Sequence, residues 1–175
     1  MRSTLKALIV GMLFLGTGLL TYQIYNFVWK AGDTYQFVLQ FLPGLPFGIA
    51  CSLRFMRPRT RMAWAVLLDC AAWDVAFRIG LTAAGDHMIP CVNTAVAGIV
   101  GALGVTAATG LGCKPCLTRR VLTGSAVAGA LGGIPFGLVV GRSPLENLIL
   151  AISFPLWQVL VGLWIGMNVQ QSPTN

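Results

Sequence analysis

Leu42-Pro43-Gly44-Leu45-Pro46-Phe47-Gly48 is the stretch from which the fold can be worked out, because its Gly-x-Pro-Phe-Gly pattern returns as Gly133-Ile134-Pro135-Phe136-Gly137. Proline removes a backbone hydrogen-bond donor and clashes with the carbonyl group one turn earlier, and glycine lets the backbone deviate. Both copies lie within long apolar runs. We therefore expect two helices that kink or break at this pattern, near the middle of a membrane.

Two weaker matches accompany this pair, in the same chain order. Ala7-Leu8-Ile9-Val10-Gly11 is similar to Ala97-Gly98-Ile99-Val100-Gly101. Trp73-Asp74-Val75 is similar to Trp157-Gln158-Val159. Three matches that keep one order predict an internal duplication.

The composition indicates that lipid surrounds most of the chain. Hydrophobic residues make up 56% of the 175 positions and charged residues 10%, and the mean hydropathy is +0.77. These values exclude a soluble domain and predict an all-α integral membrane protein with a single membrane domain over 1–175, because open sheet edges do not occur in lipid. The apolar runs approach the ~20 residues that a helix needs to cross the bilayer. The expected helices cover 6–28, 35–53, 62–84, 92–112, 121–141 and 146–168.

The duplication divides these helices into a first three-helix repeat over 6–84 and a second over 92–168. Each half has an odd number of spans, so the second half enters the membrane from the opposite side and a pseudo-two-fold axis lies in the membrane plane. The first helix has the basic start and the apolar run of a signal peptide. Its counterpart in the second half favours a retained span.

Basic residues gather in the gaps on one predicted side of the membrane, and this bias sets the orientation. It places both termini, including a short tail over 169–175, in the cytoplasm, and we expect a bacterial cytoplasmic (inner) membrane. We therefore interpret the net charge of +7 as a signal of membrane topology, and we expect no nucleic-acid partner. The residues on the basic side are Arg2, Lys6, Arg54, Arg57, Arg59, Arg61, Lys114, Arg119 and Arg120.

The third predicted helix carries three charges within an apolar run, Asp69, Asp74 and Arg78. Asp74 lies ~18 Å along this helix, where a charge costs at least ~2.5–3.5 kcal/mol. Asp74 and Arg78 are four residues apart and can pair. The pair then either only holds the fold together or serves a proton relay, an ion site or a substrate contact. Asp69 lies ~140° round the helix from Asp74, facing either the arginine-rich loop or a different helix.

The duplication also gives Asp74 a counterpart in Gln158, with Trp73 and Trp157 beside them as walls of a cavity. Symmetric Pro/Gly interruptions are the best sequence pointer to a transport site between two halves. The predicted solute or ion pathway contains Asp69, Trp73, Asp74, Arg78, Trp157 and Gln158, with Pro43, Gly44, Pro46, Phe47, Gly48, Gly133, Pro135, Phe136 and Gly137.

The cysteines give weaker signals. Cys113 and Cys116 have the spacing of a redox or metal-binding pair, but zinc needs two further ligands, and incidental or lipidated loop cysteines fit equally. Asp86-His87-Met88 with Cys91 has soft-metal ligands that suit copper, or forms an ordinary polar loop. We expect no disulfide framework and no cofactor.

Three functions fit these patterns. The first is a small transporter or channel that moves a small solute, an ion or a proton through a midplane site between the halves. The second is an accessory or substrate-capture subunit of a larger membrane complex, and the third is a thiol- or metal-handling protein. The glycine and alanine faces also permit a homodimer. No hydrolytic triad, phosphate loop or haem pair is present in the sequence, so we do not expect an enzyme.

Overall fold

The computed structural model describes residues 2–30, 39–56, 61–82, 90–138 and 146–169. These described ranges are 94% helical and contain no strand, which confirms the all-α prediction. The predicted bounds agree with the observed ones to within a few residues, except for the range 35–53. The elements are α1 (Arg2–Lys30), η1 (Leu42–Gly44), α3 (Leu45–Phe55), α4 (Met62–Thr82), α5 (Pro90–Gly110), η3 (Lys114–Leu117), α6 (Arg119–Gly137) and α7 (Glu146–Val169).

Three of the described helices are long and apolar enough to cross a membrane, and they indicate membrane association. They run over Thr4–Lys30, Pro90–Gly110 and Asn147–Asn168. The other helices depart from a simple spanning segment for visible reasons. α4 includes three charged residues, α6 begins with two arginines, and α3 is only 11 residues long. Of the six predicted crossings, the described residues support three by length and composition, and the other three remain a prediction.

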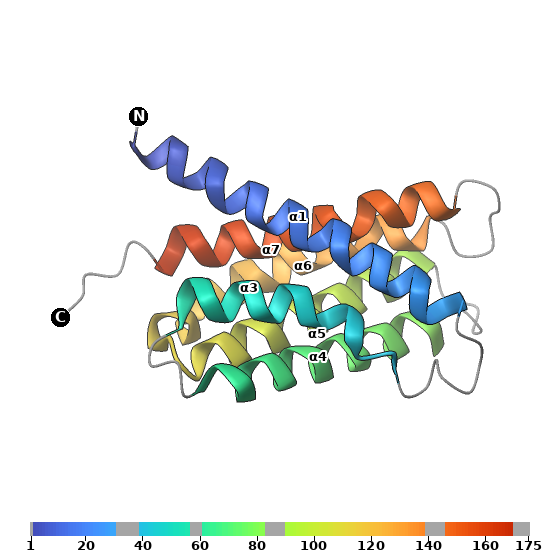
Figure 1. Cartoon of the computed structure of the whole chain (residues 1–175), viewed down its shortest axis with the longest axis horizontal. Helices are drawn as coiled ribbons and strands as arrows, with labels where there is room; N and C mark the ends of the chain where they lie inside the picture. Colours follow the sequence, from blue (N-terminus) through green and yellow to red (C-terminus); the bar gives the residue numbers. More distant parts are fainter. Residues whose placement is uncertain (1, 31–38, 57–60, 83–89, 139–145, 170–175) are drawn as a thin grey trace.

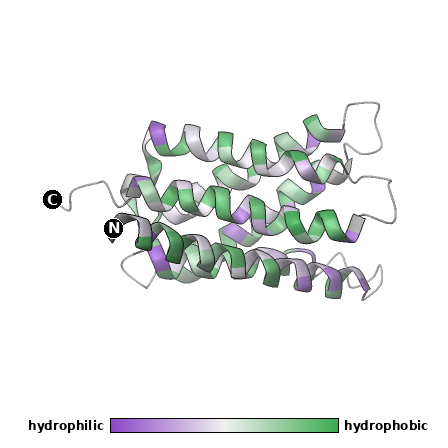
Figure 2. Cartoon of the chain, turned by 90° about the horizontal axis from the view of Figure 1, so that it is seen from above, coloured by the Kyte–Doolittle hydropathy of each residue, from purple (hydrophilic) through white to green (hydrophobic). Residues whose placement is uncertain are grey.

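Several polar side chains lie inside the bundle, and many large apolar side chains are exposed on its outer surface. Phe27, Leu53 and Trp64 are each more than 60% exposed, whereas Gln158, Thr106 and Ser125 are fully buried. Figure 2 shows hydrophobic residues along the helices, with hydrophilic ones mostly near the helix ends. This distribution suits a lipid surround, in which apolar surface needs no burial and polar groups need partners inside the protein.

Within the described residues, the α-helices α1 and α3 to α7 form a closed ring in which each helix packs against the next and α7 returns to α1. The start of α1 and the end of α7 lie at the same end of this ring (Figure 1). If a two-fold axis lay in the membrane plane, the helices of the second half would run round the ring in the opposite direction to those of the first half, as seen along the membrane normal. Both halves follow the same sense, so the packing does not confirm the 3+3 inverted repeat.

The two Gly-x-Pro-Phe-Gly copies occupy different places in their helices. The first copy lies at a break, because η1 ends at Gly44 and α3 begins at Leu45. Pro46 then sits in the first turn of α3, where a missing amide costs nothing. Pro135 instead lies in the last turn of α6, which ends at Gly137. The predicted break in the middle of 121–141 is thus replaced by the end of a helix, and 139–145 lies outside the described residues.

α5 and α6 approach each other closely because glycines face each other across their contact. A Cβ atom at Gly98 or at Gly129 would collide with the backbone of the other residue. The same is true of Gly133 against the carbonyl group of Thr94. Small residues at such crossings are the usual means by which membrane helices gain packing energy.

Candidate functional site

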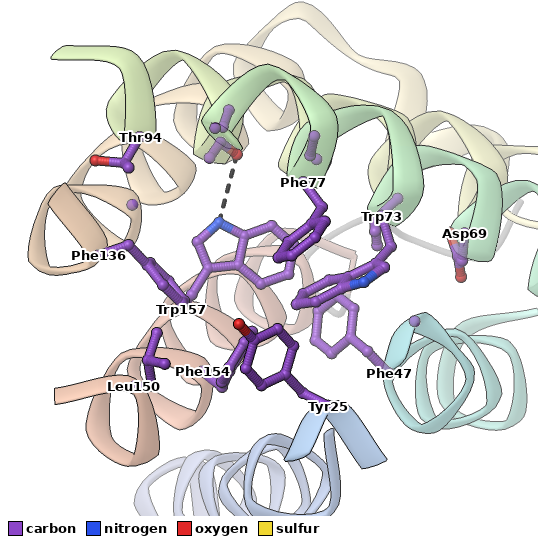
Figure 3. A pocket seen from close by; sticks show the side chains of 18 residues that line it. Tyr25, Phe47, Asp69, Trp73, Phe77, Thr94, Phe136, Leu150, Phe154 and Trp157 are labelled. Atoms are coloured by element: carbon purple, nitrogen blue, oxygen red, sulfur yellow. Dashed lines mark hydrogen bonds between the residues drawn. The ribbon is translucent and has the colours of Figure 1, made fainter. Parts of the chain in front are cut away.

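A cavity of about 170 Å³ lies within the ring, and all six helices and η1 contribute to its wall. Figure 3 shows its labelled side chains converging from these elements. The lining residues are Tyr25, Gly44, Phe47, Asp69, Trp73, Ala76, Phe77, Gly80, Thr94, Ala97, Gly98, Gly101, Val105, Gly133, Phe136, Leu150, Phe154 and Trp157.

Three pairs matched by the predicted duplication meet on this cavity. Each half of the chain supplies one member of each pair. The two halves therefore build one site, although the ring itself does not confirm their symmetry. The pairs are Gly44 with Gly133, Phe47 with Phe136, and Trp73 with Trp157.

Aromatic side chains from five helices lie on the wall, and many of their rings contact one another. The Phe154 ring has its centroid 5.2 Å from that of Tyr25, 5.3 Å from that of Trp73 and 5.0 Å from that of Phe136. The Phe47 and Trp157 centroids are 5.4 Å apart. Such tilted and edge-on pairs stabilise the ring arrangement by about 0.5–1.5 kcal/mol each. The wall is thus a connected aromatic surface.

Contacts with α5 and α6 fix the position of the Trp157 side chain. Its indole Nε1 donates to the carbonyl oxygen of Gly98, at 3.4 Å, as Figure 3 shows. A Cβ atom at Gly132 would lie 2.7 Å from the Cα atom of Trp157. The indole therefore rests on glycine backbone, which holds its face toward the cavity.

Among the described residues, Asp69 is the one charged residue on the cavity wall. It is 1% exposed, and neither carboxyl oxygen has a hydrogen-bond partner among the described residues. No Lys, Arg or His among the described residues lies on this wall. An isolated charge in apolar surroundings is strongly unfavourable, so a carboxyl group placed there must hold a proton or meet a cation.

Two glycines of the first motif make room for this carboxyl group. A Cβ atom at Gly48 would lie 2.9 Å from Oδ2 of Asp69. A Cβ atom at Gly44 would lie 2.9 Å from the Cβ atom of Trp73 and 3.4 Å from the backbone oxygen of Asp69. The motif therefore lets η1 and α3 sit directly against α4, beside the acidic group.

Asp74 and Arg78 form the predicted ion pair, with Nε of Arg78 2.8 Å from Oδ2 of Asp74. Neither residue lines the cavity, because the face of α4 that points inward is the one that carries Asp69 and Trp73. Gln158, the predicted counterpart of Asp74 in the second half, does not line the cavity either. Asp69, which the sequence placed either toward the arginine-rich loop or toward another helix, faces α3.

Gln158 instead holds the bundle together beside the cavity. Its Nε2 donates to Oγ1 of Thr21 at 2.7 Å, and that hydroxyl donates to the carbonyl oxygen of Pro43 at 3.0 Å. Gln158 is fully buried. The predicted pathway residues that do not line the cavity are Pro43, Pro46, Gly48, Asp74, Arg78, Pro135, Gly137 and Gln158.

Sequence reasoning missed Tyr25, Phe77 and Phe154 on the wall. A helical spacing carries part of the signal, because Asp69, Trp73 and Phe77 follow one another at four-residue intervals and so share one face of α4. Phe154 and Trp157, three residues apart, share a face of α7 in the same way. Nothing in the local sequence distinguishes Tyr25 from other aromatic residues of α1.

Cys113 and Cys116 lie between α5 and α6, and both are buried free thiols. A hydrogen bond from the Cys116 thiol lowers the pKa of Cys113 to about 7, and the same contact together with burial raises the pKa of Cys116. Within the described residues no group of three or more His, Cys, Asp or Glu side chains is placed to hold a metal ion. The copper hypothesis at Asp86-His87-Met88 falls outside the described residues.

Comparison with protein-family models, with curated proteins and with solved structures finds no match for this chain. The described part of the chain is all-helical, and three of its helices are long and apolar enough to cross a membrane, which indicates membrane association. The cavity is the feature from which a function can be argued.

Proposed function

We propose that the chain is a small membrane transporter that binds a small solute in the aromatic cavity, with Asp69 as the group that takes up a proton or a cation. The observation that carries this proposal is a fully buried carboxyl group without a partner among the described residues, on the wall of a cavity inside the bundle. Ionisable residues inside membrane bundles are expensive to place and usually mark substrate, ion or proton pathways.

In this proposal all six helices cross the bilayer, with both termini on the cytoplasmic side. Arg54, Arg61, Arg119 and Arg120 lie at the chain segments that turn on that side, in keeping with the positive-inside bias. A hydrogen bond also joins two of these turns, since Nη1 of Arg61 donates to the carbonyl oxygen of Leu111 at 2.8 Å.

The size of the cavity limits the solute. A volume of about 170 Å³ is close to the ~150 Å³ of an apolar cavity that accepts benzene. A solute of a few heavy atoms fits this space, and a sugar polymer, a peptide or a lipid does not. The proposal is therefore restricted to small solutes and ions.

Flux measurements on the purified full chain test this function. The protein is reconstituted in liposomes that enclose a pH-sensitive dye, and choline, glycine, glucose, lactate and K⁺ are added outside in turn. We expect at least one of these to give a saturable uptake or a linked proton movement, and Asp69→Asn to abolish it. Asp69→Asn keeps the shape of the side chain and removes its ability to exchange a proton.

Ser125→Ala is the matched control, because Ser125 is fully buried and its hydroxyl also lacks a partner among the described residues, yet it does not line the cavity. We expect this variant to keep the flux. Absence of flux with every solute, together with stable co-purification of a larger membrane protein, would favour the accessory-subunit hypothesis instead.

A further inference from the structure

The described residues of the cavity wall include one acidic side chain and no basic one. Asp69 brings a negative charge when ionised, and no basic side chain stands among the described residues of the wall. A carboxyl group pairs favourably with a cation and repels an anion, and in low-dielectric surroundings both effects are stronger than in water. The ionised form of Asp69 therefore disfavours an anionic solute, and a neutral solute would leave that charge without a counter-charge.

A bare metal ion does not suit this wall either. Hard cations such as Ca²⁺ require about six to eight oxygen ligands, and the cavity offers one carboxyl group, with the Thr94 hydroxyl already donating to the backbone of its own helix. Within the described residues no cluster of metal-binding side chains exists. The cation must therefore be one that does not need oxygen on all sides.

The aromatic rings on the wall supply a contact for a cation that does not need oxygen ligands on all sides. Rings from α1, α3, α4, α6 and α7 line the same space as Asp69, and Figure 3 shows Asp69 next to Trp73 at its edge. Ring faces attract cations, most strongly when water is excluded, and aromatic cages bind quaternary ammonium groups. A carboxyl group at the edge of such a cage matches an ammonium group that carries small alkyl substituents.

We propose that the cavity binds a small organic cation, a quaternary ammonium or a protonated amine, with Asp69 as its counter-charge and the aromatic rings around its alkyl groups. This inference names the substrate class of the proposed transport function and rests on it for the fate of the bound cation. Binding itself is measured without transport.

A proton and the organic cation then compete for the same carboxyl group. The empty cavity holds Asp69 with its proton, and binding of the cation releases that proton. The titratable groups near Asp69 are the Cys51 thiol on α3 and the Cys70 thiol on α4, and Tyr25 lines the same cavity. None of these is a cation at neutral pH, so none replaces the organic cation as a partner.

Titration calorimetry of the purified full chain with choline and with its neutral carbon isostere 3,3-dimethyl-1-butanol tests the inference. The two molecules have the same shape and differ in charge. We expect choline to bind at least about tenfold more tightly than the alcohol, with an affinity that falls as the pH is lowered. Asp69→Asn should remove this preference, whereas Ser125→Ala should keep it.

The outcomes separate the substrate class from the function. Equal affinity for choline and the alcohol, or no heat from choline and tetramethylammonium, would overturn the organic-cation inference even if Asp69→Asn fails to fold, since this comparison needs only the wild-type chain. Liposome flux of glycine or glucose without choline binding would leave the transport proposal standing with another substrate. Choline binding without any flux would keep the ligand class and remove the transport function.

Discussion

Nε2 of Gln158 on α7 donates a 2.7 Å hydrogen bond to Oγ1 of Thr21 on α1, a residue 137 positions earlier in the chain. The same hydroxyl donates to the carbonyl oxygen of Pro43 on η1, at 3.0 Å. Both Gln158 and Thr21 are fully buried. One threonine thus joins the first helix, the last helix and the break that precedes α3, at the place where the ring closes.

Replacing Thr21 by valine keeps the shape of the side chain and removes both hydrogen bonds. The Gln158 amide and the Pro43 carbonyl oxygen then lack this partner inside an apolar bundle. We expect Thr21→Val to lower the free energy of unfolding by about 0.5–2 kcal/mol, the range found for hydrogen bonds between membrane helices. Equilibrium unfolding of the purified protein in mixed micelles measures this change.

Two further variants show whether the lower free energy of unfolding comes from the hydrogen bonds of Thr21. Thr17→Val removes a hydroxyl that donates only to Phe14 in its own helix, at 3.0 Å, and should cost less than Thr21→Val. The double variant Thr21→Val with Gln158→Leu should recover part of the loss, because replacing both partners removes the unpaired amide. Additive losses in the double variant would contradict a direct coupling.

Gly48→Ala is expected to displace the Asp69 carboxyl group. The added Cβ would lie 2.9 Å from both the Cβ atom and Oδ2 of Asp69, so α3 or α4 must shift. Overpacking of this kind costs about 1–3 kcal/mol, and choline affinity should fall together with stability. Gly16→Ala on α1 is the control, since its Cβ would meet nothing within 4 Å and the variant should keep both properties.

Gly129→Ala should separate α5 from α6. Its Cβ would collide with the backbone oxygen of Gly98 and lie 2.6 Å from the Cβ atom of Ala102, and neither helix backbone can yield locally. We expect the yield of folded protein on size-exclusion chromatography to fall several-fold, as for overpacked sites of about 1–3 kcal/mol. Gly80→Ala, whose Cβ would make an ordinary 3.6 Å contact with Ala97, should behave like the wild type.

The helices could be predicted from the sequence because membrane spans depend on local composition. The apolar runs from 62, 92 and 146 match α4, α5 and α7 to within about two residues. The break at Gly44 could also be predicted, since proline and glycine act locally on the backbone. The position of the second motif at the end of α6 could not, because it depends on where the chain leaves the bundle.

The identity of the acidic site residue depends on tertiary packing. Asp69 and Asp74 both lie in α4, and depth along the helix favoured Asp74. The side of α4 that faces the ring is set by its contacts with α3 and α5. The four-residue spacing shows that Asp69 shares a face with Trp73, but it does not show that this face points inward. A duplication also seemed to pair Asp74 with Gln158, whereas the pairs that meet are the glycines, phenylalanines and tryptophans on the cavity wall.

Cys113 should react with small thiol reagents in a way that reports its contact with Cys116. The hydrogen bond from Cys116 lowers the pKa of Cys113 to about 7, and the thiolate is the reactive form. The reaction rate of Cys113 with methyl methanethiosulfonate should therefore rise as the pH increases to about 7 and level off above it. Peptide mass spectrometry, which separates the label at Cys113 from that at the other cysteines, measures this rate between pH 5.5 and pH 9.5, a window on both sides of the unperturbed value of about 8.5.

Variants at position 116 test whether the hydrogen bond from Cys116 causes the low pKa of Cys113. Cys116→Ala removes the donor, so the midpoint of the Cys113 profile should move up toward about 8.5. Cys116→Ser retains a hydroxyl donor and should keep the midpoint low. A profile that stays unchanged in Cys116→Ala, or a wild-type rate that still climbs at pH 9, would show that Cys113 behaves as an ordinary thiol. The buried pair would then be a packing feature of the turn between α5 and α6, where Cys116 is fully buried and Cys113 is 7% exposed.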